Sequence, residues 1–381
     1  MVKKKILVVT ERRADYSKFK PILKKIAKSK KLDYFLIVTG SHLLKEYGKT
    51  IDEIKNDGFK ITSTFSMYRK DRHDTGAEMM HAFSRAIENL TTQIEKLKPD
   101  VILSGFDIGA NFASAIIGAH MNILVSHVEG GEVTGTIDDS IRHATTKFAH
   151  LHFTSNSQAT KRLIKLGENP KHIFTVGTPS LDSILEVKNI PKIILEKKYG
   201  IDFKKPFIVM LQHTVTSEIN KIDLHVFETI NAIKELDIQA IIIHGNADAG
   251  SKKILKIIEN SKIKQFSTIP FNEFINILKH SSALIGNSSS GIIEAPFLHI
   301  PSINIGTRQE GRLHSASVID VSYNKNQIKK AINKTINDKK FLNKIKKLKS
   351  LYGDGHSSDK IVDILEKINL EDIPIQKKIN Y

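Results

Sequence analysis

The chain has 381 residues, of which 40% are hydrophobic and 26% charged, enough for two or three domains with buried cores. It contains no cysteine, which excludes disulfide scaffolds, thiolate metal sites and cysteine nucleophiles. Because nothing points to an oxidising compartment, we expect a cytoplasmic protein. No stretch approaches the roughly 18 apolar residues of a membrane-spanning helix, so we expect no membrane partner.

The formal net charge of +17 raises the question of nucleic-acid binding, because a basic surface neutralises phosphates. Only nine of the 58 basic residues are arginine, and the lysines are spread over helical stretches. Such a spread is typical of solvated helix faces, so we expect no nucleic-acid partner. An arginine in a loop stands out in this chain, because its planar fork suits phosphate.

Short β-branched runs alternate with amphipathic stretches along the first half of the chain. The runs expected to form strands cover residues 5–10, 34–40, 61–66, 100–106, 123–129, 151–155 and 172–177. Stretches with helical periodicity, such as 15–29 and 78–97, lie between them. This alternation predicts a parallel sheet.

A second series of such runs begins after a Pro- and Lys-containing stretch. It covers residues 207–213, 240–246, 265–270, 283–291, 301–306 and 317–321. We therefore predict an α/β protein of two Rossmann-like, doubly wound parallel-sheet domains. The expected divisions are a first domain over 1–180, a second over 181–368, and a basic, frayed tail over 369–381.

In open parallel sheets, ligands bind at the carboxyl ends of the strands, so we expect the functional residues in the loops there. The loop GNSSSGIIEAP, residues 286–296, has glycines for close backbone approach and serines that cap the following helix. It predicts a phosphate cradle without a Walker lysine, or else a plain capped turn. A carboxylate at Glu294 fits ribose hydroxyls better than phosphate.

Two further loops of the second series carry candidate ligand contacts. Arg308, in GTRQEGR, is a candidate phosphate contact, with a surface salt bridge as the alternative. His213 follows the first strand of this series. It is a candidate general acid or pyrophosphate contact, although a lone loop histidine is more often structural.

The densest cluster of titratable residues lies over residues 126–152. Glu129 and Asp138 both belong to its Gly-rich loop, where two carboxylates can converge on one substrate. Asp138 or Asp139 can instead be only the cap of the following helix. The chain has no HxxxH or HExxH spacing, so we expect no metal.

Two other strand ends contribute candidates. Asp107 follows the run 100–106, and Arg13 stands where a nicotinamide enzyme would carry GxGxxG, which is missing. We therefore expect no nicotinamide cofactor.

These loops together resemble one enzyme family. The motifs RADYSKFKPI, TGSHL, HVEGGEVTGTIDDSIRH, LQHTVT, GNADAGSK, IGNSSSGIIEAP, NIGTRQEGR and YGDG are similar, in the same order, to those of hydrolysing UDP-N-acetylglucosamine 2-epimerases of sialic acid biosynthesis. The likeness covers about residues 5–368. It implies a glycosyltransferase-B-like fold with a deep cleft, and a reaction without cofactor or metal.

The resemblance implies that UDP-GlcNAc and water are converted to N-acetylmannosamine and UDP. A base removes the C2 proton while UDP leaves by anti elimination, which gives a 2-acetamidoglucal. Water then adds to C1, and a proton returns to the opposite face of C2. The family also implies a homodimer or homotetramer.

The resemblance also implies roles for individual residues. The catalytic positions are Asp107, Glu129, Asp138 and His213. The nucleotide contacts are Arg13, Asn246, Ser288, Ser289, Glu294 and Arg308. The sugar-side positions are His42, His127 and Arg142.

One departure leaves the substrate open. The family commonly has an arginine after its first catalytic acid, where this chain has Ile108. Members that feed legionaminic acid synthesis act on UDP-2,4-diacetamido-2,4,6-trideoxyglucose, which is the alternative substrate. A non-hydrolysing 2-epimerase and a glycosyltransferase of the same fold are the alternative reactions.

Overall fold

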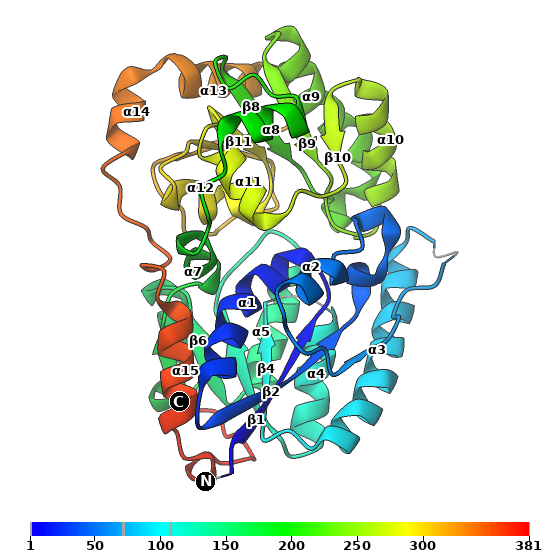
Figure 1. Cartoon of the computed structure of the whole chain (residues 1–381), viewed down its shortest axis with the longest axis vertical. Helices are drawn as coiled ribbons and strands as arrows, with labels where there is room; N and C mark the ends of the chain where they lie inside the picture. Colours follow the sequence, from blue (N-terminus) through cyan, green and yellow to red (C-terminus); the bar gives the residue numbers. More distant parts are fainter. Residues whose placement is uncertain (1, 71–72, 107–108, 381) are drawn as a thin grey trace.

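The computed structural model describes residues 2–70, 73–106 and 109–380, so Asp107 lies outside the described residues. Within these residues the strands form two sheets, one of seven strands in the order β3-β2-β1-β4-β5-β6-β7 and one of six in the order β10-β9-β8-β11-β12-β13 (Figure 1). All the strand pairs are parallel.

The first sheet consists of β1 (Lys4–Thr10), β2 (Leu32–Val38), β3 (Ser63–Thr64), β4 (Val101–Gly105), β5 (Leu124–Val128), β6 (Leu151–Thr154) and β7 (Ile173–Thr175). The second consists of β8 (Phe207–Leu211), β9 (Gln239–Ile243), β10 (Lys264–Phe266), β11 (Ala283–Gly286), β12 (Ser302–Ile305) and β13 (Val318–Val321). Each of these strands falls on or within one of the runs expected from the sequence, or extends it by a few residues.

The helices alternate with the strands. Those before β8 are α1 (Arg13–Lys28), α2 (Ile51–Asn56), α3 (Gly76–Leu97), α4 (Gly109–His120), α5 (Ile137–Phe148), α6 (Ser157–Lys165), α7 (Pro179–Leu185) and α8 (Lys192–Tyr199). Those after β8 are α9 (Ile222–Glu235), α10 (Ser251–Ser261), α11 (Phe271–Leu278), α12 (Glu294–Phe297), α13 (Lys325–Asn337), α14 (Lys339–Ile345) and α15 (Ser357–Lys367). Among the described residues, no helix combines the length and the apolar character needed to span a bilayer.

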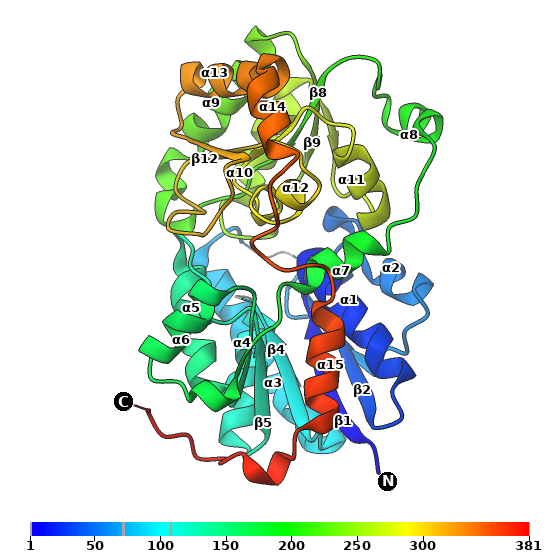
Figure 2. The same ribbon diagram turned by 90° about the vertical axis from the view of Figure 1, so that its left-hand side faces the viewer.

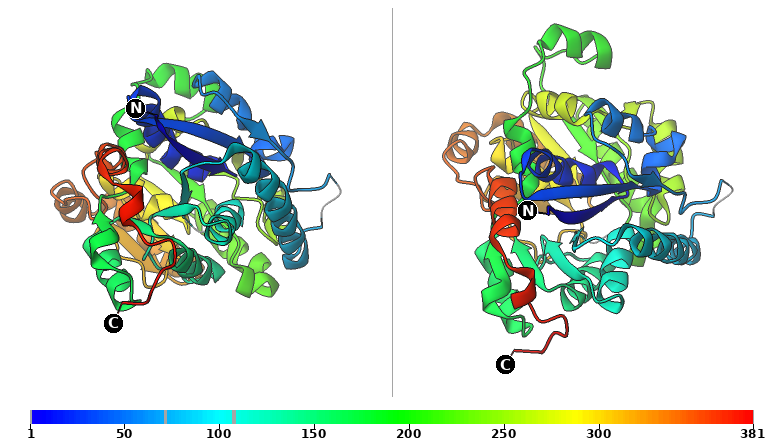
Figure 3. Two further views of the ribbon diagram at one scale, coloured as in Figure 1. Left: turned by 90° about the horizontal axis from the view of Figure 1, so that it is seen from below. Right: turned by 60° about the horizontal axis from the view of Figure 1, so that its bottom comes forward.

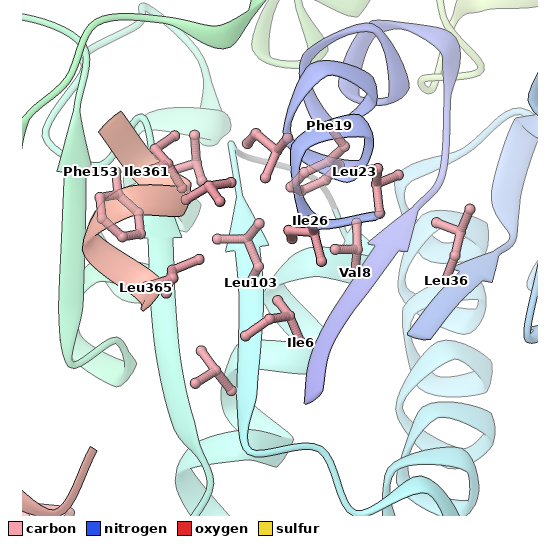
Figure 4. Packing of buried hydrophobic residues seen from close by; sticks show 14 of the residues in the cluster. Ile6, Val8, Phe19, Leu23, Ile26, Leu36, Leu103, Phe153, Ile361 and Leu365 are labelled. Atoms are coloured by element: carbon pink, nitrogen blue, oxygen red, sulfur yellow. The ribbon is translucent and has the colours of Figure 1, made fainter. Parts of the chain in front are cut away.

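Each sheet is buried on both faces, which explains its continuous β-branched runs. Successive side chains of a strand point to opposite faces. In β1, Ile6 and Val8 therefore pack into one cluster with Phe19 of α1 (Figure 4), while Leu7 and Val9 pack into another. The predicted pair of doubly wound domains is confirmed.

The packing of α15 differs from the expected domain division. Residues up to 368 were expected in the second domain, but α15 lies beside α1 of the first (Figure 2). Its Ile361 and Leu365 are buried in the same cluster as Phe153 (Figure 4). The apolar face of this helix completes the first core, because α1 and the sheet leave that space open to it.

The segment after α15 is not frayed over its described residues. Ile373 is buried in the first core, and His150 Nε2 lies 2.9 Å from Ile375 O. Lys377 Nζ lies 2.6 Å from Glu168 Oε2. Figure 3 shows this terminal segment continuing from α15 along the first domain. Of the two lysines of this segment, Lys377 forms an ion pair with the buried carboxylate of Glu168.

Candidate active site

A cleft lies between the two domains, where loops at the carboxyl ends of strands of both sheets face each other. Its empty volume, including its opening to solvent, is ≈1350 Å³. Ten residues predicted from the sequence line it: Arg13, Glu129, Asp138, Arg142, His213, Asn246, Ser288, Ser289, Glu294 and Arg308. The candidates come from six separate segments of the chain, at residues 13, 129–142, 213, 246, 288–294 and 308.

The two sugar-side histidines are not in the cleft, which corrects that expectation. His42 is fully buried, and its two ring nitrogens lie 2.9 Å from Thr10 Oγ1 and 2.6 Å from Thr50 Oγ1. His127 is also fully buried, with Nδ1 3.2 Å from Thr146 Oγ1. Burial lowers the pKa of both to about 3. They are neutral core residues.

Glu129 follows β5 directly and is 3% exposed. Its Oε2 accepts a hydrogen bond from Lys18 Nζ at 2.5 Å, and its Oε1 accepts one from the Thr178 hydroxyl. Burial raises the pKa of this carboxyl, but the Lys18 ammonium and the Thr178 hydroxyl more than offset that effect, so the pKa lies below its usual value. Glu129 is therefore ionised at neutral pH and held from both oxygens.

Asp138 and Asp139 take different roles in the first turn of α5. The cap of this helix is Thr136, whose hydroxyl accepts from Asp138 N at 3.3 Å. Asp139 Oδ1 accepts from Thr134 N at 3.0 Å, which makes it a structural residue of the loop. Asp138 lines the cleft, with Oδ2 3.8 Å from an Arg308 nitrogen of the other domain.

His213 is held as a neutral ring. Its Nδ1 accepts a hydrogen bond from Asn246 N at 3.3 Å, which places the ring proton on Nε2. Burial, followed by the positive charge of Arg308, lowers its pKa well below the usual value. His213 can therefore donate one hydrogen bond to a negatively charged ligand without itself carrying charge.

The serine loop begins at Gly286, at the end of β11. Gly286 has φ +124°, and a Cβ there would lie 2.2 Å from Leu211 O, so no other residue fits without a shift of the backbone. Ser288 then caps a short 3-10 helix, its hydroxyl accepting from Ser290 N at 3.3 Å. Its neighbour Asn287 accepts from His213 N at 2.6 Å, which joins this loop to the histidine loop.

Three further charged groups line the cleft near the second domain. Arg308 donates to Asn287 O at 3.1 Å, so one of its nitrogens is fixed by the serine loop. Arg13, the first residue of α1, donates to Thr268 Oγ1 and to the carbonyl of Ile269 in the second domain. Glu294 is 6% exposed, and burial raises its pKa.

Sequence reasoning missed two cleft residues, Lys18 and Arg312, and a third residue, Thr178, that contacts Glu129. Lys18 carried no signal, because it is one lysine of many on an amphipathic helix. Arg312 was visible as one of nine arginines. It lies 3.4 Å from Glu132 Oε2 of the first domain, and both side chains are buried. Thr178 lies in no recognised motif, and only the fold brings it to Glu129.

No group of three or more His, Asp or Glu side chains placed to hold a metal ion occurs among the described residues. The polar lining includes the hydrogen-bond donors His213, Asn246 and Arg308 from the second domain, and the carboxylates Glu129 and Asp138 from the first. This arrangement suits an anionic ligand held on one side and proton transfer on the other.

The chain is similar to known proteins over most of its length. The family model described as UDP-N-acetylglucosamine 2-epimerase matches residues 24–366. A UDP-N,N'-diacetylbacillosamine 2-epimerase (hydrolyzing) from Legionella pneumophila is 34% identical over 371 residues, which cover 96% of this chain and 97% of that protein. A UDP-N-acetylglucosamine 2-epimerase from Neisseria meningitidis is 35% identical over 342 residues, 89% of each chain.

The fold is also found in solved structures. The crystal structure of a Neisseria meningitidis UDP-GlcNAc 2-epimerase bound to UDP-GlcNAc superposes with a TM-score of 0.83. It covers 96% of this chain and 100% of that one at 18% identity, so the likeness is one of fold, which is glycosyltransferase-B-like. With the family model and the relatives above, it follows that the chain belongs to the UDP-N-acetylglucosamine 2-epimerase family.

Proposed function

We propose that the protein is a hydrolysing 2-epimerase, which converts a UDP-linked 2-acetamido sugar and water into the free C2 epimer and UDP. One observation carries the proposal: Glu129 and Asp138 of the first domain face His213 and Arg308 of the second across one cleft. Elimination of UDP needs a carboxylate for the proton and donors for the departing diphosphate, and this cleft holds both.

In the first half of the reaction, the C2 proton moves to a carboxylate while the C1–O bond breaks. The electron pair of that bond goes to the UDP oxygen, and a 2-acetamidoglucal is left. Glu129 suits the role of proton acceptor, because its neighbours keep it ionised at neutral pH and therefore able to take up a proton. The Nε2–H of His213 and the guanidinium of Arg308 stabilise the charge that develops on the diphosphate.

In the second half, the oxygen of one water adds to C1 and a proton is delivered to the opposite face of C2. The proton lost by that water goes to a carboxylate, so the products are the free sugar and UDP with one water consumed. Asp138 is the second carboxylate placed for proton transfer in the described cleft. The role of Asp107 rests on the resemblance alone.

The nucleotide fits the second-domain side of the cleft. The serine loop, with Ser288 and Ser289, and the nearby Arg13 and Asn246 offer donors for the diphosphate. The carboxylate of Glu294 suits the two ribose hydroxyls, as a bidentate acceptor.

Two sugars are candidates. UDP-GlcNAc, giving N-acetylmannosamine for sialic-acid-type synthesis, is favoured by the motif resemblance and by the name of the meningococcal relative. UDP-2,4-diacetamido-2,4,6-trideoxyglucose, the UDP-N,N'-diacetylbacillosamine of the Legionella relative's name, is the second candidate. Ile108 in place of the family's arginine indicates either a weaker phosphate contact or a different sugar, so both sugars stay candidates.

The resemblance also supports a homodimer or homotetramer, and the lack of cysteine supports a cytoplasmic location. The motif HVEGGEVTGTIDDS, which resembles the hydrolysing branch, speaks against a non-hydrolysing epimerase.

The test is an NMR time course of the purified protein with each UDP-sugar separately, in deuterated water. Release of UDP together with a free sugar that carries deuterium at C2 is the expected result, and the tube that reacts names the substrate. A product still attached to UDP would instead indicate a non-hydrolysing epimerase. UDP binding without turnover of either sugar would contradict the proposal and favour a transferase that needs an acceptor.

A further inference from the structure

The chain passes between the two domains twice, and the two passages lie against each other. Thr178 N donates to Tyr352 O at 2.8 Å. A Cβ on Gly353 would lie 2.9 Å from the Cα of Gly177, so the two backbones approach closely only because both residues are glycine. Figure 2 shows α7 at this junction, beside the segment that leads into α15. We call residues 176–178 and 352–354 the crossover.

The hydroxyl of Thr178 makes no capping hydrogen bond to α7, the helix that follows this residue. A threonine at the cap of a helix usually accepts a hydrogen bond from a backbone N–H of the first turn. Thr178 caps α7 without any such bond. Its hydroxyl instead donates to Oε1 of Glu129, on a loop 49 residues earlier in the chain. Stability of α7 alone therefore does not explain this residue.

Glu129 is held in an unusual backbone conformation as well. Its φ is +62°, a region that residues other than glycine rarely adopt. The Thr178 hydroxyl and the Lys18 ammonium fix its two carboxylate oxygens from two different elements. The other titratable groups that act on this carboxylate are Arg312, Glu294 and Tyr352.

The same short segment reaches the nucleotide side of the cleft. Ser180 Oγ lies 3.4 Å from Thr178 Oγ1, and the Ser180 side chain acts on the carboxyl of Glu294, whose pKa it lowers. The segment that links the domains therefore contacts the carboxylate of Glu129 in the first domain and acts on that of Glu294 in the second. Both side chains belong to the segment that links the domains, so a change in the angle between the domains would displace them.

We propose that Thr178 is a positioning residue, whose hydroxyl aligns Glu129 for proton transfer at C2 and couples this alignment to the crossover between the domains. The inference rests on the proposed function for its catalytic part. Removing the hydroxyl leaves Glu129 held only from Oε2, free to turn about its contact with Lys18. Misplacement of a reacting group by about 1 Å lowers the rate roughly 100-fold.

The test compares Thr178→Val with Thr178→Ser, which keeps the hydroxyl. Thr175→Val is the matched control, because Thr175 lies three residues earlier and its hydroxyl contacts Thr160 away from the cleft. We expect kcat of Thr178→Val to fall about 10- to 100-fold, with the dissociation constant for UDP within about twofold of wild type. Thr178→Ser should recover most of kcat, and Thr175→Val should match wild type.

The pH profile separates positioning from a loss of stability. Thr178 lowers the pKa of Glu129, so Thr178→Val should move the acid limb of kcat/KM to higher pH. A ¹³C NMR titration of the glutamate carboxyls, assigned with Glu129→Gln, should show the same rise without any turnover. Unchanged kcat and an unchanged Glu129 titration in Thr178→Val would overturn the inference, and so would equal losses of UDP binding in the Val and Ser variants. If wild type turns over neither sugar but the titration shifts, the proposed function and the catalytic role fail while the contact stands.

Discussion

Lys377→Met tests the contact that holds the C-terminal segment on the first domain. In wild type, Lys377 Nζ donates to Glu168 Oε2 at 2.6 Å and to Thr146 O at 2.9 Å. Methionine keeps the aliphatic length but removes both donors. Glu168 is 2% exposed and retains Lys147 Nζ at 2.9 Å and His152 Nε2 at 3.1 Å.

The remaining partners set the magnitude. Removing one partner of a buried ion pair costs about 3–5 kcal/mol when the other charge is left alone. Glu168 keeps two partners, so the loss is closer to that of one hydrogen bond to a charged group, about 1.5 kcal/mol. For a domain of this size, that corresponds to a fall in Tm of roughly 3–6 °C.

The assay is urea unfolding at pH 7, with Lys378→Met as the control, because Lys378 is the next residue and is exposed. Burial raises the pKa of Glu168, but His152 and Lys377 outweigh it and lower the pKa to about 2 from the usual 4.5. The stabilisation by Glu168 is therefore complete above pH 4.5 and is lost as the pH falls towards 2. The stability gap between wild type and Lys377→Met should close over that range.

Equal free energies of unfolding for Lys377→Met and Lys378→Met at pH 7 would refute this reasoning. A gap that stays constant down to pH 2 would also refute it, because the ion pair with Glu168 would then not be its source.

Three further predictions concern the cleft. Glu129→Gln and Asp138→Asn should each lower kcat by about 10²- to 10⁴-fold and leave UDP affinity, measured by calorimetry, nearly unchanged; a loss of UDP affinity with turnover preserved would contradict their assignment. Arg308→Ala should raise KM and lower kcat in steady-state assays, since the proposed role of Arg308 is to bind the diphosphate both in the substrate and as it leaves. Unchanged KM and kcat would exclude that role. Lys18→Met should raise the pKa of Glu129 and move the acid limb of kcat/KM to higher pH. If the acid limb does not move, Glu129 is not the group whose titration produces it.

The strands were predictable because their residue types and their burial agree. A parallel strand covered by helices on both faces needs apolar side chains along its whole length, and runs such as 207–211 show this directly in the sequence. The place of α15 was not predictable, because an amphipathic helix near the end of a chain fits either core. Only the contacts of Ile361 and Leu365 decide between them.

The site was predictable where residue type and strand end coincide, as for Glu129 and Arg308. It was not predictable for His42 and His127, which lie at or near strand ends but point into the core. The position of a residue along a strand predicts where its backbone lies. The direction of its side chain reverses with a shift of a single residue, because successive side chains point to opposite faces of the sheet. Lys18 was missed for another reason, since a common residue type carries little information in a lysine-rich chain.

The return of α15 to the first domain affects how the protein is made. During synthesis the strands of the first sheet emerge first, yet the face of the core that holds Phe153 is covered only when residues 357–367 have left the ribosome. Until then the nascent first domain exposes an apolar surface, and the second domain must be synthesised in the meantime. A polypeptide released early would keep that surface, so chaperones and proteases can distinguish it from a chain that includes α15.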